Sequence, residues 1–360
     1  MAQTVPALKE DRIVFAAGPK SFSVRDVIDL AHFRGEVEPH WHELLTRVAA
    51  QQKAGESEAE IDDSAIDEAA IAFRYQYDLI TAEETERWLE LRGLTLADFG
   101  DYFAREYWAK SCRAKLNLPA PPLSEATAEL RELLAVDLIL NGQLDAMAGQ
   151  LSWRLASADV VDIAALEADR ERARFLARSG LGDGELTKWL EGLGRDEAWF
   201  DGATMLEAAF RKECAGLLTP DAAEREIGAL RLPLTRFEVE TIEFESHDAA
   251  SEAVWCVRND GMSMAEVAQE GRYPYRRAEL VLEDIPDDLQ QRFLSLTPGS
   301  VLDPIPREDG FQLSRLLGKA EPKPDDPAVR ARIEQRILQR HFADLTSKRV
   351  RWELMPALLE

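Results

Sequence analysis

The sequence predicts an α+β protein that is mostly helical, and three observations support this fold class. Helical periodicity with capping signals covers most of residues 23–231, and one helix pattern occurs there twice. From residue 232, side chains alternate between apolar and polar and include β-branched and aromatic types, as is typical of strands. A basic helical pattern begins at Pro327. We therefore expect tandem helical modules, a smaller α/β domain and a C-terminal helix.

The repeated helix pattern defines the first two domains. "TAEETERWLELRGL" occupies residues 81–94 and "GDGELTKWLEGLGR" occupies residues 182–195, so that Trp88 matches Trp189 at an offset of 101 residues. Each copy stops at a glycine, the residue that most readily adopts the left-handed conformation at a helix end. We assign residues 1–117 and 118–231 to two related helical modules. The two tryptophans fit either core packing or contact with a ligand.

Start and stop signals divide the helical half. Ser23 with Asp26, and Thr81 with Glu84, have the spacing of capping boxes, in which each side chain satisfies free helix amides. Thr219 precedes Pro220, which suits the first position of a helix. The elements expected here are a strand at 12–17, helices at 65–80, 82–92 and 96–116, a rigid connector at 117–124, and further helices to about residue 230.

The α/β domain is expected at 232–326 and a C-terminal segment at 327–360. The predicted elements are a strand from 232, helices at 248–258 and 286–296, a helix capped by Ser263 and Glu266, two short strands before 320, a helix at 327–346 and a strand at 349–353. Residues 319–353 carry nine Lys and Arg against six Asp and Glu, in a chain whose net charge is −24. We therefore predict that the C-terminal helix packs back on the acidic N-terminal module and that 349–353 pairs with 12–17.

The composition disfavours several classes of function. A net charge of −24 argues against binding to nucleic acid, which needs clustered basic residues. No apolar run approaches the ~18 residues of a membrane helix, and the N-terminal sequence lacks the regions of a secretory signal, so we expect a cytoplasmic protein. Cys112, Cys214 and Cys256 form no CxxC pair, and His40 and His42 lack a supporting ligand cluster. We expect no metal and no cofactor.

Six residues of the α/β region follow a known pattern. They are Leu296, Pro298, Gly299, Pro304, Gly310 and Phe311. Their order resembles the parvulin peptidyl-prolyl isomerase domain, in which an apolar helix, L-x-P-G and a short strand lead to a glycine, an aromatic residue and a histidine. Segments 23–112 and 124–214 resemble the helical module that accompanies parvulin domains in SurA-type chaperones. More narrowly, the chain is similar to the PpiC-like proteins of maturation pathways for ribosomally made, modified peptides (RiPPs), for example crocagin-type pathways.

The resemblance implies where a catalytic site would lie, and this sequence departs from it there. The family's two facing histidines fall at Thr241 and Gln312, and its Asp or Cys is missing from residues 270–278. The apolar positions that would hold a proline ring are retained. They are Ile285, Leu289 and Phe293. These three residues fit a groove and an ordinary helix core equally well.

We therefore expect a non-catalytic peptide-binding chaperone or escort that holds a precursor peptide for its modifying enzymes. Two alternatives stay open: a peptidyl-prolyl isomerase with residual activity, and a scaffold that binds the enzymes without touching the peptide. The expected peptide contacts are Ile285, Leu289, Phe293, Phe311, Gln312, Thr241, Trp88 and Trp189. The expected partners are the precursor peptide and the modifying enzymes, without nucleic acid or membrane, and both a homo-dimer and a hetero-dimer remain open.

Overall fold

The computed structural model describes residues 9–57, 59–111, 121–307 and 310–354. The chain forms two compact units: the first comprises 1–215 and 341–360, and the second comprises 216–340. Most described residues are helical, and two small antiparallel sheets complete the fold, which confirms the predicted α+β, mostly helical class. None of the described helices combines the length and the hydropathy needed to cross a membrane.

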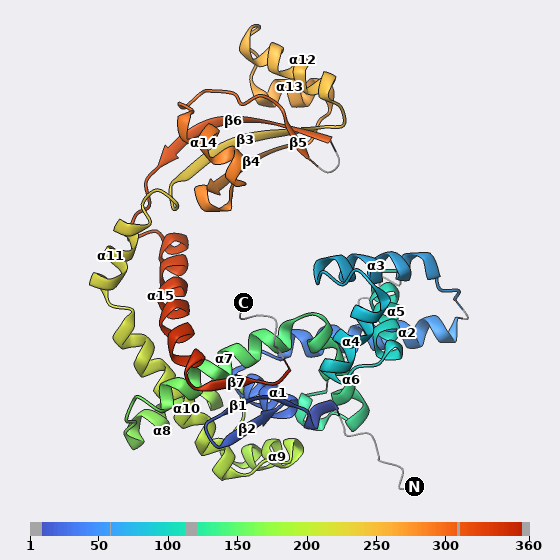
Figure 1. Cartoon of the computed structure of the whole chain (residues 1–360), viewed down its shortest axis with the longest axis vertical. Coiled ribbons are helices and arrows are strands. Elements are labelled where there is room, and N and C mark those ends of the chain that lie inside the picture. Colours follow the sequence, from blue (N-terminus) through green and yellow to red (C-terminus); the bar gives the residue numbers. More distant parts are fainter. Residues whose placement is uncertain (1–8, 58, 112–120, 308–309, 355–360) are drawn as a thin grey trace. The chain divides into compact units, whose positions relative to one another are not determined.

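The first unit is a helical assembly around a small sheet (Figure 1). Its helices are α1 (Val24–Arg34), α2 (Glu38–Glu56), α3 (Asp63–Gln76), α4 (Ala82–Arg92), α5 (Leu96–Ser111), α6 (Ala128–Leu140), α7 (Gln143–Ala158), α8 (Ala165–Ser179), α9 (Asp183–Leu193) and most of α10 (Glu197–Leu217). Its strands are β1 (Ile13–Ala17), β2 (Lys20–Ser23) and β7 (Val350–Trp352), in the order β2-β1-β7. The predicted pairing of 349–353 with 12–17 is confirmed, with Phe15 opposite Trp352.

The repeated sequence forms the same structure twice. Helix α4 begins at the predicted capping box and ends at Gly93, and α9 ends at Gly194. The two glycines have φ values of 72° and 67°, in the left-handed region that side chains with a Cβ rarely adopt. An arginine from the N-terminal segment caps each end: Arg12 donates to the Glu90 and Leu91 carbonyls, and Arg25 donates to the Leu193 carbonyl. In both copies, an arginine from another part of the chain thus satisfies carbonyl groups at the C-terminal end of the helix.

The aromatic packing is also duplicated. In the first copy Phe73 meets the edges of Trp88 and Phe99 at centroid distances of 5.4 and 5.2 Å. In the second copy Phe175 meets Trp189 and Phe200 at 5.0 and 5.1 Å. These edge-to-face contacts stabilise aromatic clusters beyond simple burial. Residues of both copies belong to one continuous hydrophobic core, so the predicted modules 1–117 and 118–231 share a single compact unit.

The second unit contains a four-stranded antiparallel sheet covered on both faces (Figure 1). Its order is β4-β3-β6-β5, formed by β3 (Arg236–Phe244), β4 (Tyr275–Val281), β5 (Ile305–Arg307) and β6 (Gly310–Ala320). Helix α14 (Asp287–Ser295) packs with Phe237 and Val239 on one face. Helices α12 (His247–Arg258) and α13 (Met264–Gly271) pack with Ile242 and Phe244 on the other, because successive strand residues point to opposite faces.

The last long helix corrects the predicted docking of the C-terminal segment. Most of α15 (Pro327–Ser347) packs within the second unit, where its apolar residues share a core with α11 (Pro220–Ala229). Its arginines pair there too: Arg332 and Arg336 with Glu283, and Arg340 with Glu226. Only the end of α15 reaches the N-terminal unit, where Phe342 stacks on Trp153 at 4.9 Å. The prediction that the arginines of α15 pair with the acidic N-terminal module is therefore wrong, because their partners Glu283 and Glu226 lie in the second unit.

Two strands differ from the sequence-based expectation, and one predicted domain boundary falls inside a compact unit. Strands β2 and β4 were not predicted, because KSFS is short and YRRAELV carries three charged residues on an exposed edge. Helix α11, expected in the second module, lies in the second unit, so the predicted boundary at 232 falls inside that unit. The helix predicted at 96–116 is described as far as Ser111, and residues 112–116 lie outside the described part of the chain.

Candidate functional site

Thr241 and Gln312, which stand where the parvulin pattern has its two histidines, lie on one face of the second sheet. Thr241 on the central strand β3 pairs with Ser314 of β6 on one side and Arg276 of β4 on the other. Gln312 lies two residues before Ser314, so its side chain is on the same face. Thr241, Ser314 and Gln312 are all buried. Thr241 and Gln312 therefore lie on adjacent strands and on the same face of the sheet.

These side chains form a row of hydrogen bonds. Gln312 Nε2 donates to Ser314 Oγ at 3.0 Å, and Arg307 Nε donates to Gln312 Oε1 at 2.9 Å. Arg276 Nε donates to Thr241 Oγ1 at 3.2 Å. Aliphatic hydroxyl and amide groups do not change protonation state near neutral pH, whereas imidazole does. The row can orient a bound chain by hydrogen bonding but does not supply a general acid or base.

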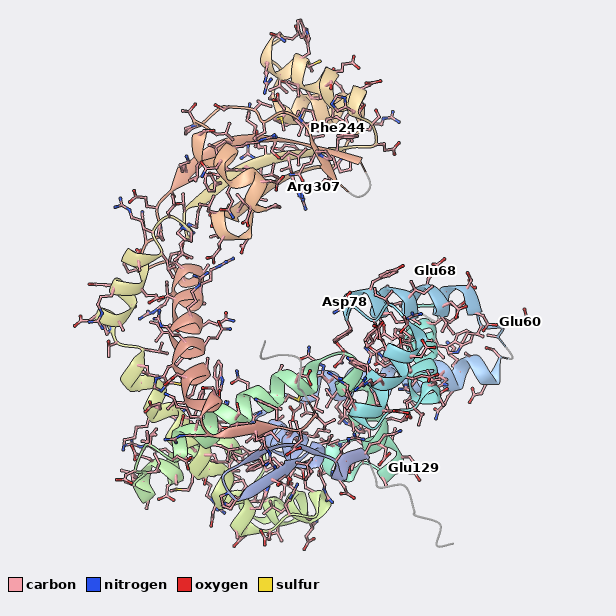
Figure 2. The ribbon with its side chains drawn as sticks, in the orientation of Figure 1. Glu60, Glu68, Asp78, Glu129, Phe244 and Arg307 are labelled. Carbon is pink, nitrogen blue, oxygen red and sulfur yellow. The ribbon has the colours of Figure 1, made fainter. Side chains whose placement is uncertain are left out.

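An open pocket of about 780 Å³ lies at this end of the sheet. Its lining is Glu243, Phe244, Arg276, Pro306, Arg307, Gly310, Phe311 and Gln312. Figure 2 shows Phe244 and Arg307 at the same end of the sheet. Glu243 pairs with Arg276 across β3 and β4, with Oε1 and NH2 3.4 Å apart. Phe311 and Gln312, both expected peptide contacts, therefore belong to a real concavity with a polar rim.

The three expected proline-pocket residues lie elsewhere on the same face. Ile285, Leu289 and Phe293 are exposed by 5%, 7% and 3%, and they pack with Phe237 and other core residues under α14. Residues this deeply buried offer little surface to a ligand. None of the three lines the pocket at Gln312. Their placement favours the helix-core interpretation over the groove interpretation.

A buried carboxylate on the opposite face of the sheet has a structural explanation. Glu240 is 2% exposed and accepts hydrogen bonds from Tyr275 and Arg277, while Arg315 lies 2.6 Å from its second oxygen. Burial alone would raise the pKa of Glu240, but these donors outweigh it and hold the pKa below its usual range. The carboxylate is therefore ionised and fully engaged in joining β3, β4 and β6.

The two tryptophans of the repeat have different surroundings. The Arg92 guanidinium covers the ring of Trp88 at 3.9 Å from its centroid, and Trp88 lines none of the described pockets. Trp189 lines a pocket of about 370 Å³ in the first unit. The lining is His32, Phe33, Gly35, Val37, Glu38, Trp41, His42, Pro121, Pro122, Leu123, Phe175, Arg178, Ser179, Leu181 and Trp189. Of the duplicated pair, only the second tryptophan is placed to contact a ligand in a described pocket.

The polar groups of the Trp189 pocket are fixed by one another. Trp189 Nε1 donates to His32 Nε2 at 3.2 Å, so the imidazole proton is on Nδ1, which donates to Glu38 Oε1 at 2.8 Å. Burial would raise the pKa of Glu38, but the hydrogen bond from His32 outweighs it and lowers the pKa. Glu38 Oε2 is buried and has no hydrogen-bond partner in the part of the chain that the structure describes. This oxygen is therefore shielded from solvent beside an apolar cavity.

Within the described ranges, no group of three or more His, Cys, Asp or Glu side chains could hold a metal ion. Cys214 and Cys256 are free thiols, and burial raises the pKa of Cys214 to about 11. A thiol with so high a pKa is a poor nucleophile. Cys112 lies outside the described residues. Neither Cys214 nor Cys256 lines the Trp189 pocket or the pocket at Gln312.

No protein-family model and no curated protein matches the chain, whereas solved structures match it at low identity. The peptidylprolyl isomerase PrsA from Bacillus cereus is 17% identical, with a TM-score of 0.38, covering 62% of this chain and 88% of its own. The foldase PrsA from Streptococcus pneumoniae is 12% identical, with a TM-score of 0.29, covering 97% and 94%. A structure described as a SurA-like chaperone from Campylobacter jejuni is 13% identical, with a TM-score of 0.20, covering 62% and 88%. At such values, functional assignment depends on the pockets themselves.

Several pocket residues gave no signal in the sequence. His32 comes from α1, and Glu38 and Trp41 come from α2, and no motif distinguishes them from other helix residues. Arg276 and Arg307 lie on strands whose register with β3 and β6 could not be read from the chain. Trp189 could be identified from the sequence, because it occupies the same place in the repeated helix pattern as Trp88.

Proposed function

We propose that the protein is a non-catalytic peptide-binding chaperone that holds an extended segment of a client polypeptide. The observation that carries the proposal is the Trp189 pocket. Its volume of about 370 Å³ suits one or two large side chains, and its walls are mainly aromatic and aliphatic. Such a pocket accepts an apolar side chain of the peptide.

The pocket at Gln312 supports the same role in the second unit. Arg276 and Arg307 on its rim donate hydrogen bonds, and backbone carbonyls of a peptide are suitable acceptors. The side chains on this face are held by hydrogen bonds: Gln312 donates to Ser314, and Arg276 donates to Thr241. This arrangement favours binding of a peptide over catalysis of its isomerisation. Each pocket contributes modestly, because ordering a flexible peptide costs a few kcal/mol of the gross interaction energy.

In its more specific form, the proposal names the client as a ribosomally made precursor peptide. The protein would hold this peptide in the cytoplasm while modifying enzymes act on it. This specific form depends on the resemblance described from the sequence. It is tested separately from general peptide binding.

The test uses a fluorescein-labelled peptide of about 12 residues with Phe and Leu at alternate positions, which is extended and apolar on one side. Ser179 is exposed at the rim of the Trp189 pocket, so Ser179→Trp should fill the cavity without entering the core. We expect fluorescence anisotropy to show saturable binding by the wild type and roughly tenfold weaker binding by this variant, because an apolar contact worth about 1.4 kcal/mol is lost.

Ser251→Trp on α12 is the matched control, since Ser251 is also exposed but lines no described pocket. It should bind the peptide like the wild type. Absence of binding by the wild type would favour a scaffold, and equal binding by Ser179→Trp would remove the Trp189 pocket from the proposal. The specific form fails if the precursor peptide encoded beside the gene binds no more tightly than the labelled apolar peptide.

A further inference from the structure

The outward face of α3 carries two large apolar side chains that do not contribute to the core. Ile71 and Tyr75 are 47% and 73% exposed. They are four residues apart, which places them on the same side of the helix. The opposite side of α3 packs through Phe73 into the hydrophobic core. The helix is therefore apolar on a face that no other described element covers.

The second copy of the module shows that this face is not required for folding. Phe73 and Phe175 hold the same position against Trp88 and Trp189, so α8 is the structural counterpart of α3. On α8 the residues equivalent to Ile71 and Tyr75 are Ala173 and Ala177, and both are exposed. The module thus forms with alanine at both places. Internal packing of the module therefore does not require large side chains at these two positions.

The charge around the two faces also differs. Residues 63–92 hold eight acidic and three basic side chains, whereas 165–193 hold six acidic and five basic ones. Asp67 and Glu68 lie one turn before Ile71 and are exposed. Figure 2 shows Glu68 on α3 and Asp78 just beyond its C-terminal end. The apolar pair of the first copy is thus bordered by negative charge, while α8 carries Arg170, Arg172 and Arg174.

We propose that this face of α3 docks a cationic amphipathic helix of a partner protein. Ile71 and Tyr75 would cover the partner's apolar stripe, and Asp67, Glu68 and Asp78 would pair with Lys or Arg beside it. The surface is distinct from both peptide pockets, since none of these five residues lines either of them. The protein would therefore bind a peptide and a second protein at separate places.

The probe is a labelled Leu/Lys peptide of about 18 residues, five helical turns, with leucines along one face. Binding is measured by fluorescence anisotropy at about 0.15 M salt, where long-range attraction to a −24 protein is largely screened. The control peptide has the same composition in an order that gives no apolar face. We expect the amphipathic peptide to bind roughly tenfold more tightly than the control peptide.

The decisive variant is Ile71→Ala with Tyr75→Ala, which copies the second module. It should lower affinity for the amphipathic peptide roughly tenfold while the melting temperature stays unchanged. Trp255→Ala is the matched control, because Trp255 is 64% exposed on α12 in the other unit. It should bind like the wild type. Asp67→Asn with Glu68→Gln should weaken binding and reduce its salt dependence.

Four results would overturn the proposal. The first is equal binding of the two peptides, which would indicate attraction to net charge alone. The second is unchanged binding by the Ile71 and Tyr75 double variant. The third is a wild-type dimer in sedimentation analysis that the double variant converts to a monomer, because the face would then be covered by a second copy of this chain. The fourth is a lowered melting temperature of the double variant, which would show that Ile71 and Tyr75 have a folding role.

Discussion

Phe15 on β1 lies opposite Trp352 on β7, with ring centroids 5.1 Å apart. Phe15 is completely buried and also stacks on Phe22 of β2 at 5.1 Å. The C-terminal strand thus supplies one wall of the core around the N-terminal strand. The integrity of the first unit therefore depends on residues from both ends of the chain.

Trp352→Ala should destabilise the first unit by about 1–2 kcal/mol, less than the 3–5 kcal/mol typical of a fully buried aromatic, because Trp352 is half-buried. Chemical denaturation followed by circular dichroism measures this change. Arg351→Ala on the same strand is the control, since the Arg351 side chain is 80% exposed and should change stability little. Equal stability of the two variants would mean that β7 is dispensable.

Gly93→Ala and Gly194→Ala should each lower the free energy of unfolding by about 1–2 kcal/mol. Both glycines have positive φ, and an added Cβ would lie 2.6 Å from Arg12 NH1 at Gly93 or 2.8 Å from Arg25 NH2 at Gly194. Gly149→Ala within α7 should instead stabilise the protein by about 0.5–1 kcal/mol, because the site is open and helical. Equal changes in the free energy of unfolding for all three variants would contradict the argument that positive φ makes Gly93 and Gly194 necessary.

We predict no measurable acceleration of Xaa-Pro isomerisation, whose uncatalysed barrier is ~18–20 kcal/mol. Thr241 and Gln312 are buried and engaged with Arg276 and Arg307, and neither is a titratable group at neutral pH. A protease-coupled assay on a prolyl tetrapeptide, with an active parvulin run in parallel, measures the rate. Catalysis that Gln312→Leu abolishes would show that the polar row is an active site.

Asp98 should make folding pH-dependent in the acidic range. Burial would raise its pKa, but hydrogen bonds from Lys9 and Thr95 outweigh burial and place the pKa below its usual value near 3.8. The stabilisation is thus present above that value and is lost as pH falls through the folded-state pKa. The stability difference between wild type and Asp98→Asn should therefore be constant near neutral pH and shrink in strong acid. A difference that stays constant down to pH 2, roughly two units below that value, would contradict the assignment.

The local signals in the sequence predicted local structure well. The capping boxes at Ser23 and Ser263 and the glycine stop at Gly194 appear as expected, because each depends on neighbouring residues only. The partners of the α15 arginines could not be predicted in the same way. Arg332 meets Glu283 and Asp284 because of tertiary packing, and net charge along the chain does not reveal which acidic group lies nearby.

The candidate pockets were predictable only in part for the same reason. The family pattern located Thr241 and Gln312, and the repeat located Trp189. Ile285 and Leu289 have the same apolar character in a core and in a groove, so sequence alone could not separate the two. The His32–Glu38 pair depends on the angle between α1 and α2, which no local spacing encodes.

The pairing of β1 with β7 sets an order of events during synthesis. Strand β1 leaves the ribosome before β7, which follows more than 330 residues later. At about 5–20 residues per second, that interval is on the order of tens of seconds. The second unit is continuous in sequence from 216 to 340 and can fold as soon as its own residues emerge. The first unit therefore begins first and finishes last, and in the meantime one edge of β1 stays open to other chains.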